Sequence, residues 1–530
     1  MDNIDHAPIP VIPRIAYAFT CTFALCISQF VMQSLTLNLK SLTSNSLKPK
    51  MNNTHPSTVL KIVPAITLLL LTGFNSGYSF GQEVGDRAVV TANFETKIFK
   101  KNVDTVAEGS IHTITAVNGK WCALEDVKGW LPKQYVMNLD MAKTHYDERI
   151  KANDLDWPAL AHRGMIHYEN EDYDKAFVDL NESLRVNKKN ALTWSNRGII
   201  RNAQGRAKEA LIDIDYAIKL EPKYANAHYN RGVVLSGISS NEVAIKSFDK
   251  AIELNEKNPW FFVSRGSALQ AVGKPDAAEK DYKAAIDLNK RIADSYVGLS
   301  NLYLAKDELD AAYEWADSAV ETQSRNAMAL NSRGLILYKQ DKFDDAMYDL
   351  NRAIRYAPRL PIAYSNRGIC NVAMKNYEEA IQDHNKSIDL SDSAVSRINR
   401  GVAYLGNGDF KKAKADFDVA EEMAPKFSEV LNAMAWFLAT CPDGKFRNGG
   451  KAVEKSEAAC EAGDWKVWYH VETLAAASAE VGEFKDAVKY AKQASELATS
   501  DREKAKCLEL LALFEDKKPY RTQIGTSVGQ

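Results

Sequence analysis

Residues 231–264 read RGVVLSGISSNEVAIKSFDKAIELNEKNPWFFVS, a stretch of 34 residues that begins with an Arg-Gly pair and ends just before the next one. Within it, Ala244 follows Gly232 by twelve residues. Two antiparallel helices pack closely only where their side chains are small, and a glycine and an alanine at this spacing supply such a place. The stretch therefore predicts a hairpin of two helices.

The hairpin pattern recurs along most of the chain. Arg-Gly pairs start at residues 163, 197, 231, 265, 333, 367 and 400, and Leu299-Ser300 stands where one pair is missing. In each of these eight units an alanine stands twelve residues after the second residue of the pair: Ala176, Ala210, Ala244, Ala278, Ala312, Ala346, Ala380 and Ala413. A hairpin of this size cannot bury its larger apolar residues alone, so consecutive hairpins must stack on one another.

This spacing resembles that of the tetratricopeptide repeat (TPR) family. The resemblance spans residues 157–499, about ten units, of which the ninth carries an insertion at residues 441–450. It implies a mainly α fold, a TPR α-solenoid in which helix hairpins form a right-handed superhelix. In this family the first helices line a concave surface that binds extended peptide segments of other proteins, and we expect such partners here. Residues 501–516 are predicted to form a capping helix, and residues 517–530 a disordered tail.

The candidate binding residues stand just before the arginines and are expected to face the concave surface. They are Asn196, Asn230, Asn366 and Asn399, with Ser264 and Ser332 at the same position in two other units. An amide offers both a donor and an acceptor, so a row of amides can hold the backbone of an extended chain without requiring charge. The alternative is that these side chains only satisfy local helix groups.

The arginines of the pairs have carboxylates sixteen residues later in six units. These are Asp179, Asp213, Asp281, Asp349, Asp383 and Asp416. Arg231 has Ser247 at that distance, and the unit without arginine has Leu299 and Trp315. Because the charge and its partner are mostly present or absent together, we predict an ion pair between the two helices of each unit. A row of exposed arginines that binds an acidic ligand is the alternative.

A different pattern precedes the repeats, at residues 84–140. Short runs such as Val89-Val90, 111–117 and 121–124 predict strands, and Asn118-Gly119 between the last two predicts a tight hairpin turn. From Gly109 onward the segment resembles a bacterial SH3-like domain, through EGSIHTITAVNGKW at residues 108–121 and GWLPKQYV at residues 129–136.

The SH3 resemblance implies a small β-barrel with a groove for a peptide. The residues that match the groove of peptide-binding members are Trp121, Pro132 and Tyr135. The alternative is that Trp121 and Trp130 are core residues, since a barrel this small needs large side chains to bury enough area.

Two uncharged segments lie near the N-terminus. Residues 51–81 are interpreted as a signal peptide that begins at Met51 and is cleaved after Gly81. Residues 1–50 are an N-terminal extension, either an over-annotated upstream stretch or a transmembrane segment, because residues 15–39 are uncharged and long enough to span a bilayer. We therefore expect an exported protein, periplasmic or extracellular, or one anchored in the cytoplasmic membrane if these segments are not cleaved.

Composition argues against several classes of function. The 67 basic and 69 acidic residues give a net charge of -2, which does not favour nucleic acid as a partner. We found no Gly-rich phosphate loop, nucleophile elbow or metal-binding helix pattern, so the sequence predicts no catalytic, cofactor-binding or metal site. The seven cysteines show no CxxC spacing; a pair between Cys441 and Cys460 is possible in sequence terms, but buried free thiols are favoured.

The sequence thus predicts a non-enzymatic scaffold or adaptor of the bacterial envelope. Membrane association is expected only through the N-terminal segment. Two alternatives stay open: a regulatory or targeting subunit of a cell-wall or glycosyl-transfer enzyme, and a structural component of an envelope assembly.

Overall fold

A computed structural model describes residues 87–90, 94–98, 101–106, 111–118, 121–124, 131–132, 136–499 and 501–525. The predicted N-terminal extension 1–50 and the predicted signal peptide 51–81 lie outside these residues. Within the described part, no helix combines the length and the hydropathy that a membrane span requires.

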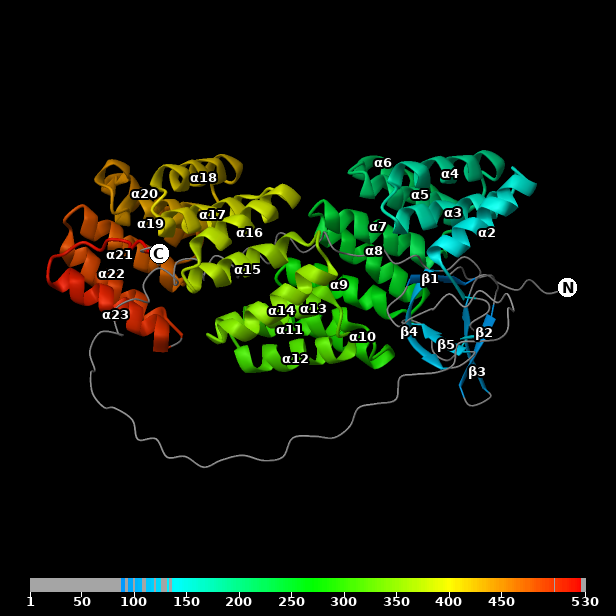
Figure 1. The fold of residues 1–530 in the computed structure, drawn as a ribbon, viewed down its shortest axis with the longest axis horizontal. Helices are drawn as coiled ribbons and strands as arrows, with labels where there is room; N and C mark the ends of the chain where they lie inside the picture. Colours follow the sequence, from blue (N-terminus) through cyan, green and yellow to red (C-terminus); the bar gives the residue numbers. More distant parts are fainter. Residues whose placement is uncertain are drawn as a thin grey trace, which may run out of the picture.

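The described part is mainly α, as predicted, and consists of hairpins in which a first helix is followed by a second (Figure 1). The first helices are α3 (Trp157–Glu169), α5 (Ala191–Ala203), α7 (Ala225–Gly237), α9 (Pro259–Ala271), α11 (Ala293–Ala305), α13 (Ala327–Lys339), α15 (Pro361–Ala373), α17 (Ala394–Asn407), α19 (Ser428–Thr440) and α21 (Trp468–Glu480). The second helices are α4 (Tyr173–Val186), α6 (Ala207–Leu220), α8 (Asn241–Leu254), α10 (Pro275–Leu288), α12 (Leu309–Thr322), α14 (Phe343–Tyr356), α16 (Tyr377–Leu390), α18 (Phe410–Met423), α20 (Gly449–Ala462) and α22 (Phe484–Leu497).

The small residues of the repeat lie where the two helices of a hairpin touch. The eight alanines of the pattern are fully buried. A Cβ atom added to Gly232 would stand 2.5 Å from Cε1 of Phe248 on the facing helix, closer than atoms can approach. Glycine is therefore required at this contact for a steric reason, and the helix pair closes around it.

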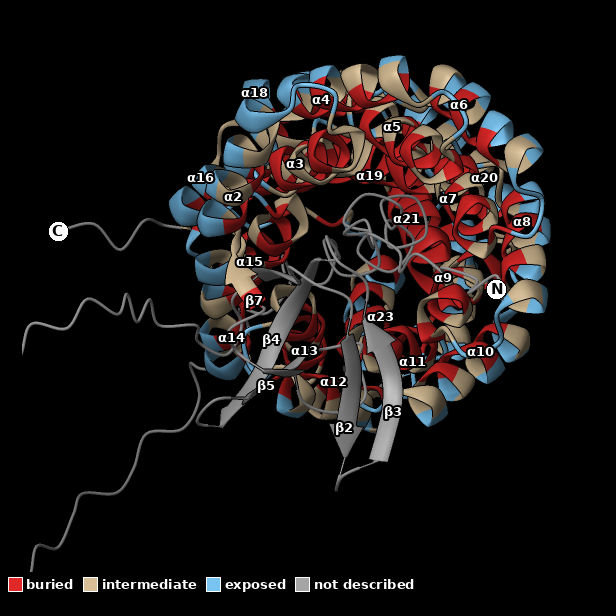
Figure 2. Ribbon diagram, turned by 90° about the vertical axis from the view of Figure 1, so that its right-hand side faces the viewer, coloured by how far each residue is buried: buried red, intermediate tan, exposed pale blue. Residues whose placement is uncertain are grey.

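Seen end-on, the hairpins curl into a ring (Figure 2). The first helices form its inner wall, while the second helices form its outer wall and carry most of the exposed residues. Two contacts join units that are far apart in sequence: Arg359 pairs with Glu171, and the Thr499 hydroxyl donates to Asp307 at 2.7 Å. All four side chains are solvent-exposed, so these contacts contribute little to stability.

One further helix stands at each end of the array. α2 (Leu139–Ala152) packs on α3, and α23 (Asp501–Glu515) packs on α22. The insertion in the ninth hairpin forms the short 3₁₀ helix η3 (Gly444–Phe446). Both α2 and α23 cover a hairpin that would otherwise expose an apolar face to water.

The predicted disordered tail is wrong for residues 517–525, which are ordered and packed on the array. The amide of Thr522 donates to the carbonyl of Thr440 at 2.9 Å, and the amide of Gly525 donates to the carbonyl of Gly406 at 3.0 Å. Thr522 is only 2% exposed. The prediction failed because a polar segment without helical periodicity is expected to be disordered, whereas contacts with distant helices, from both backbone and side chains, hold this one in place. Residues 526–530 lie outside the described part.

The β region comprises β1 (Arg87–Val90), β2 (Phe94–Ile98), β3 (Lys101–Val106), β4 (Ile111–Asn118), β5 (Trp121–Leu124), β6 (Leu131–Pro132) and β7 (Val136–Asn138). Five strands form an antiparallel sheet in the order β6-β5-β4-β1-β7, and β2 pairs with β3 separately. The three predicted strands are present. The hairpin between β4 and β5 closes on the pair Asn118 and Trp121, so Asn118 is the last paired residue rather than the first turn residue. The SH3-like barrel itself stays a prediction.

Four cysteines of the described part, Cys370, Cys441, Cys460 and Cys507, are buried free thiols, and Cys122 is also buried. Cys441 and Cys460 therefore do not pair in this structure. Burial raises the pKa of Cys460 to about 12, which keeps this thiol protonated and unreactive at neutral pH.

Candidate functional site

The arginines of the repeat belong to first helices, and their guanidinium groups reach polar groups on the second helices. In the sixth hairpin, Nε and Nη2 of Arg333 donate to the two carboxylate oxygens of Asp349 at 2.6 and 2.9 Å. Its Nη1 donates to Asp317, on the second helix of the preceding hairpin, at 2.6 Å. The predicted ion pair within the hairpin is present, and the same guanidinium also ties that hairpin to its neighbour.

This fork recurs along the array. The Nη1 groups of the other arginines reach Asp147, Asn181, Asp249, Asn351 and Asn385, each fifteen or sixteen residues earlier in the chain. Arg231 is the variant: it donates to Asp215 at 2.8 Å and to Ser247 at 3.0 Å, as its missing aspartate requires. Hydrogen bonds to Asp349, and then to Asp317, raise the pKa of Arg333 above its already high ordinary value. Each of these arginines thus binds at least one carboxylate of the array itself. The structure favours the predicted ion pairs over a row of exposed arginines that binds an acidic ligand.

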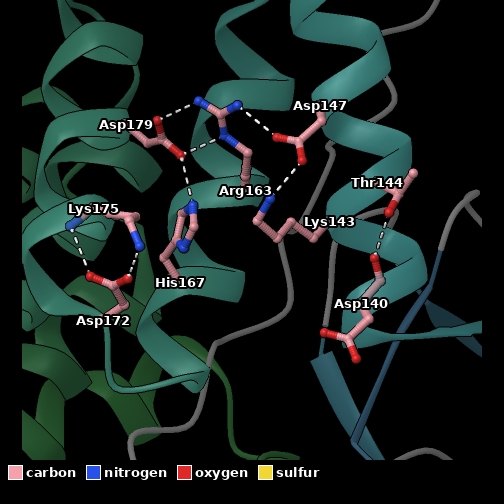
Figure 3. A network of polar contacts seen from close by, with 9 residues as sticks. All are labelled: Asp140, Lys143, Thr144, Asp147, Arg163, His167, Asp172, Lys175 and Asp179. Carbon is pink, nitrogen blue, oxygen red and sulfur yellow. Dashed lines mark hydrogen bonds and ion pairs between the residues drawn. The ribbon is translucent and has the colours of Figure 1, made fainter.

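The arginines and the groups that they bind form a series along the array. The N-terminal end of this series lies in a depression between α2, α3 and α4 (Figure 3). Arg163 donates to both oxygens of Asp179 at 2.7 and 2.8 Å and to Asp147 at 2.8 Å, and Lys143 contacts Asp147 at 2.6 Å. Figure 3 shows His167 pointing at Asp179, but their nearest atoms are 3.9 Å apart, too far for a hydrogen bond.

Most side chains that line this depression are charged, and several of them pair with one another. The lining residues are Lys143, Asp147, Arg163, His167, Asp174, Lys175, Val178 and Asp179. Burial lowers the pKa of His167, so the imidazole is neutral at physiological pH. The cluster is the first member of the arginine series. Here Asp147 of α2 accepts the bond that the second helix of a preceding hairpin accepts in the other units.

The candidate asparagines lie between the first helices of neighbouring hairpins. Asn196, Asn230, Asn366 and Asn399 are 1 to 6% exposed. Nδ2 of Asn230 donates to Ser195 at 2.9 Å, that of Asn366 to Asn331 at 2.9 Å, and that of Asn399 to Ser365 at 3.1 Å. In Asn230, Asn366 and Asn399 the Nδ2 group therefore satisfies an acceptor of the array, which is the alternative that the sequence left open, while for Asn196 the structure shows burial alone.

The carbonyl oxygens of three of these amides differ from the Nδ2 groups in having no hydrogen-bond partner among the described residues. The Oδ1 atoms of Asn230, Asn366 and Asn399 are buried and have no hydrogen-bond partner in the described part of the chain. The serines at this position differ: Ser264 donates to Tyr229 at 3.2 Å and Ser332 to Asn301 at 3.0 Å. Peptide binding by the asparagines stays a prediction, and the atoms available for it are the side-chain carbonyl oxygens.

The three SH3-like candidates are only partly described. Trp121 and Pro132 are directly opposite each other in the pairing of β5 with β6. Tyr135 lies outside the described residues. In the whole described part of the chain, no group of three His, Cys, Asp or Glu side chains could hold a metal ion.

Comparison with known proteins agrees with this architecture. Family models of the tetratricopeptide repeat match residues 225–258, 263–327, 331–394 and 394–427. No curated protein matches the chain in sequence. Residues 225–427 therefore contain TPR repeats, within a solenoid of 22 α-helices in the part of the chain that the structure describes. Repeats of this kind generally mediate contacts between proteins and are typical of non-catalytic scaffolds.

The solved structures to which this chain is similar include three that are distant in sequence. A TPR protein from Parabacteroides merdae is 19% identical over 47% of this chain and 98% of its own, with a TM-score of 0.40. Human IFIT1, solved as a dimer with PPP-AAAA, is 14% identical over 68% of this chain and 95% of its own, with a TM-score of 0.44. YrrB, described as a TPR protein with an unusual peptide-binding site, is 22% identical over 35% of this chain and 95% of its own, with a TM-score of 0.27.

Proposed function

We propose that this chain is a non-enzymatic scaffold of the bacterial envelope that binds extended peptide segments of other proteins on the inner, first-helix face of its solenoid. The TPR fold supports the binding of proteins. The signal-like segment 51–81 supports export. The unpaired asparagine oxygens support recognition of a peptide backbone rather than of charged side chains.

The observation that carries this proposal is the repeated, half-used amide. A buried carbonyl oxygen without a donor costs about 1–3 kcal/mol, so a backbone N–H that reaches it is favoured by a similar amount. In Asn230, Asn366 and Asn399 the bond from Nδ2 to the preceding hairpin fixes the direction of Oδ1. Three acceptors of one kind at equivalent positions suit a ligand that also repeats, namely an extended chain.

A second surface is proposed in the SH3-like region. Trp121, Pro132 and Tyr135 are assigned there by the resemblance, and the pairing of Trp121 with Pro132 is compatible with a shared groove. This surface gives the scaffold a second place to hold a partner.

The test uses peptides selected from a random phage-displayed library on the full chain. The affinity of a selected uncharged peptide is then measured by fluorescence anisotropy. We expect the triple variant Asn230→Ala, Asn366→Ala, Asn399→Ala to bind at least tenfold more weakly, since about 1 kcal/mol is lost per bond. Moderate salt should have little effect, because the proposed contacts are not ionic.

The matched control is the double variant Ser264→Ala, Ser332→Ala. It also loses hydrogen bonds between first helices, but it removes no unpaired acceptor. We expect it to bind like the parent. Equal binding by both variants, or release of the peptide by moderate salt, would contradict the role of the asparagines.

A further inference from the structure

The ordered C-terminal segment runs across the ends of three first helices in turn. After α23 the chain turns at Lys517, whose φ is +57°, and becomes extended where a second helix would otherwise begin. Nη2 of Arg521 then lies 2.7 Å from Glu480 at the end of α21. Thr522 bonds to Thr440 at the end of α19, and Gly525 bonds to Gly406 near the end of α17.

The spacing of these contacts matches the repeat. Thr440 and Gly406 are one unit of 34 residues apart in the array, whereas Thr522 and Gly525 are three residues apart in the segment. Three residues of extended chain cover about 10 Å, and neighbouring packed helices are about 8–10 Å apart. The step of three residues from Thr522 to Gly525 therefore matches the step from α19 to α17.

The accepting groups are carbonyls that a helix leaves unpaired at its C-terminal end. The carbonyl of Thr440 accepts the amide of Thr522, and the two hydroxyls are 2.7 Å apart. Equivalent carbonyls at Ala203, Gly237, Ala271 and Ala305 accept no backbone hydrogen bond from the described part of the chain. A free carbonyl is thus a property of many helix ends, and it does not by itself explain why the segment lies here.

Side chains found only at this end of the array supply the specificity. The ring of Tyr520 packs on Trp436 of α19 at 5.6 Å between centroids, and Glu480 attracts Arg521. A Cβ atom added to Gly525 would stand 2.4 Å from Cε2 of Tyr377, so this position admits only glycine. Ile524, between them, is 48% exposed and contributes little.

We propose that the ends of α17, α19 and α21 form a binding site for an extended segment. Such a segment has an aromatic residue, a threonine two positions later and a glycine three positions after the threonine, as in Tyr520, Thr522 and Gly525. The chain's own residues 520–525 occupy this site, and a partner segment of the same chemistry displaces them. The inference rests on the proposed peptide-binding function, and it adds a defined site, a register and an internal competitor.

The experiment compares the full chain with a chain that ends at Lys518, which keeps α23 and its closing turn. The probe is a fluorescent synthetic peptide of residues 519–530, PYRTQIGTSVGQ. We expect saturable binding to the shortened chain and at least tenfold weaker binding to the full chain. A peptide with Gly525→Val should bind the shortened chain at least tenfold more weakly, while one with Ile524→Ala should bind like the parent peptide.

Hydrogen exchange on the full chain gives a readout that does not depend on the shortened chain folding. The amides of Thr522 and Gly525 should be protected in the parent and lose at least tenfold protection in the full-length Gly525→Val variant, with Ile524→Ala unchanged. Absence of protection in the parent, or equal binding of both variant peptides, overturns the proposal. If the full chain binds library peptides through its asparagines but the shortened chain does not bind the 519–530 peptide, this site alone is overturned and the proposed function stands.

Discussion

At the scale of single residues, the arginines show how one side chain serves two contacts. A guanidinium is planar and offers five donors in a fixed geometry, so it can hold one carboxylate with two nitrogens and a second group with the third. Arg333 does this with Asp349 and Asp317. Lysine could not replace it, because an ammonium lacks the two parallel N–H groups that fit a carboxylate.

His384 is a second residue whose properties depend on its neighbours. It occupies the position that holds Leu350 in the hairpin before and Phe417 in the hairpin after, and its ring packs against Gly368. Neither ring nitrogen has a hydrogen-bond partner within the described part of the chain. Burial, with the nearby charge of Arg400, lowers its pKa to about 3.

We predict that His384→Phe makes the array less sensitive to acid. The unfolded chain takes up a proton near the ordinary histidine pKa of 6.5, whereas the folded chain does so only near 3. The parent therefore loses stability as the pH falls below 6.5, and by pH 5 this amounts to about 2 kcal/mol from this residue. Urea unfolding at pH 5 should show a gain for the variant.

The same measurement at pH 8 is the control, because the imidazole is neutral there in both states and only packing differs. Subtracting it isolates the proton. If parent and variant lose stability equally between pH 8 and pH 5, buried His384 does not contribute to the acid response.

At the scale of elements, the contact between two helices of a hairpin depends on glycine being bare. Gly232 faces Phe248, while Gly237, at the end of the same helix, has no atom near the place of a Cβ. The two glycines are therefore under different constraints, although they are five residues apart.

We predict that Gly232→Leu destabilises the array by about 1–3 kcal/mol, because the new side chain forces α7 and α8 apart. Thermal unfolding followed by circular dichroism should shift to lower temperature and broaden, as repeats lose coupling to their neighbours. Gly237→Leu is the matched variant; it should be neutral or slightly stabilising, since glycine is a poor helix former. Identical unfolding curves for both variants would mean that the register of the hairpin is wrong.

The helix α2 shows a signal in the sequence that the prediction missed. Ala142, Tyr146 and Asp147 precede Ala176, Leu180 and Asn181 by 34 residues each. Ala142 and Tyr146 are fully buried, and Asp147 accepts from Arg163. α2 therefore has the chemistry of a second helix whose first helix is replaced by other structure, and extending the period backwards from Trp157 would have identified it.

At the scale of the whole molecule, the solenoid is held by contacts between neighbours, with few contacts across the ring. This arrangement leaves the inner wall and the helix ends as continuous surfaces on which an extended chain can lie. The C-terminal segment occupies one such surface, and the asparagine row lies between the first helices that form another, with its unpaired oxygens buried.

We predict that the mature protein begins at Gln82. The polar residues after Met51, the apolar run 62–74 and the small residues before Gln82 form the three parts of a signal peptide. N-terminal sequencing of protein isolated from its native source would test this directly. Recovery of residue 1 in the isolated protein would show that both the start at Met51 and the cleavage are wrong.

The sequence by itself determined the hairpin, its period and the ion pair within it. These depend on residues at fixed spacing within one unit, and a helix converts fixed spacing into a fixed direction. Three of the seven strands described in the β region, β1, β4 and β5, followed for the same reason, from alternation and turns within short segments.

Only the tertiary structure decided which groups remain for a ligand. The asparagines stand at a position that faces the neighbouring hairpin as well as the inner wall, and their partners lie 34 or 35 residues earlier. The second bond of each arginine and the docking of residues 520–525 likewise join groups from separate units. Such contacts depend on how units stack, and the pattern within one unit carries no information about the distance between a donor in one unit and an acceptor in the next.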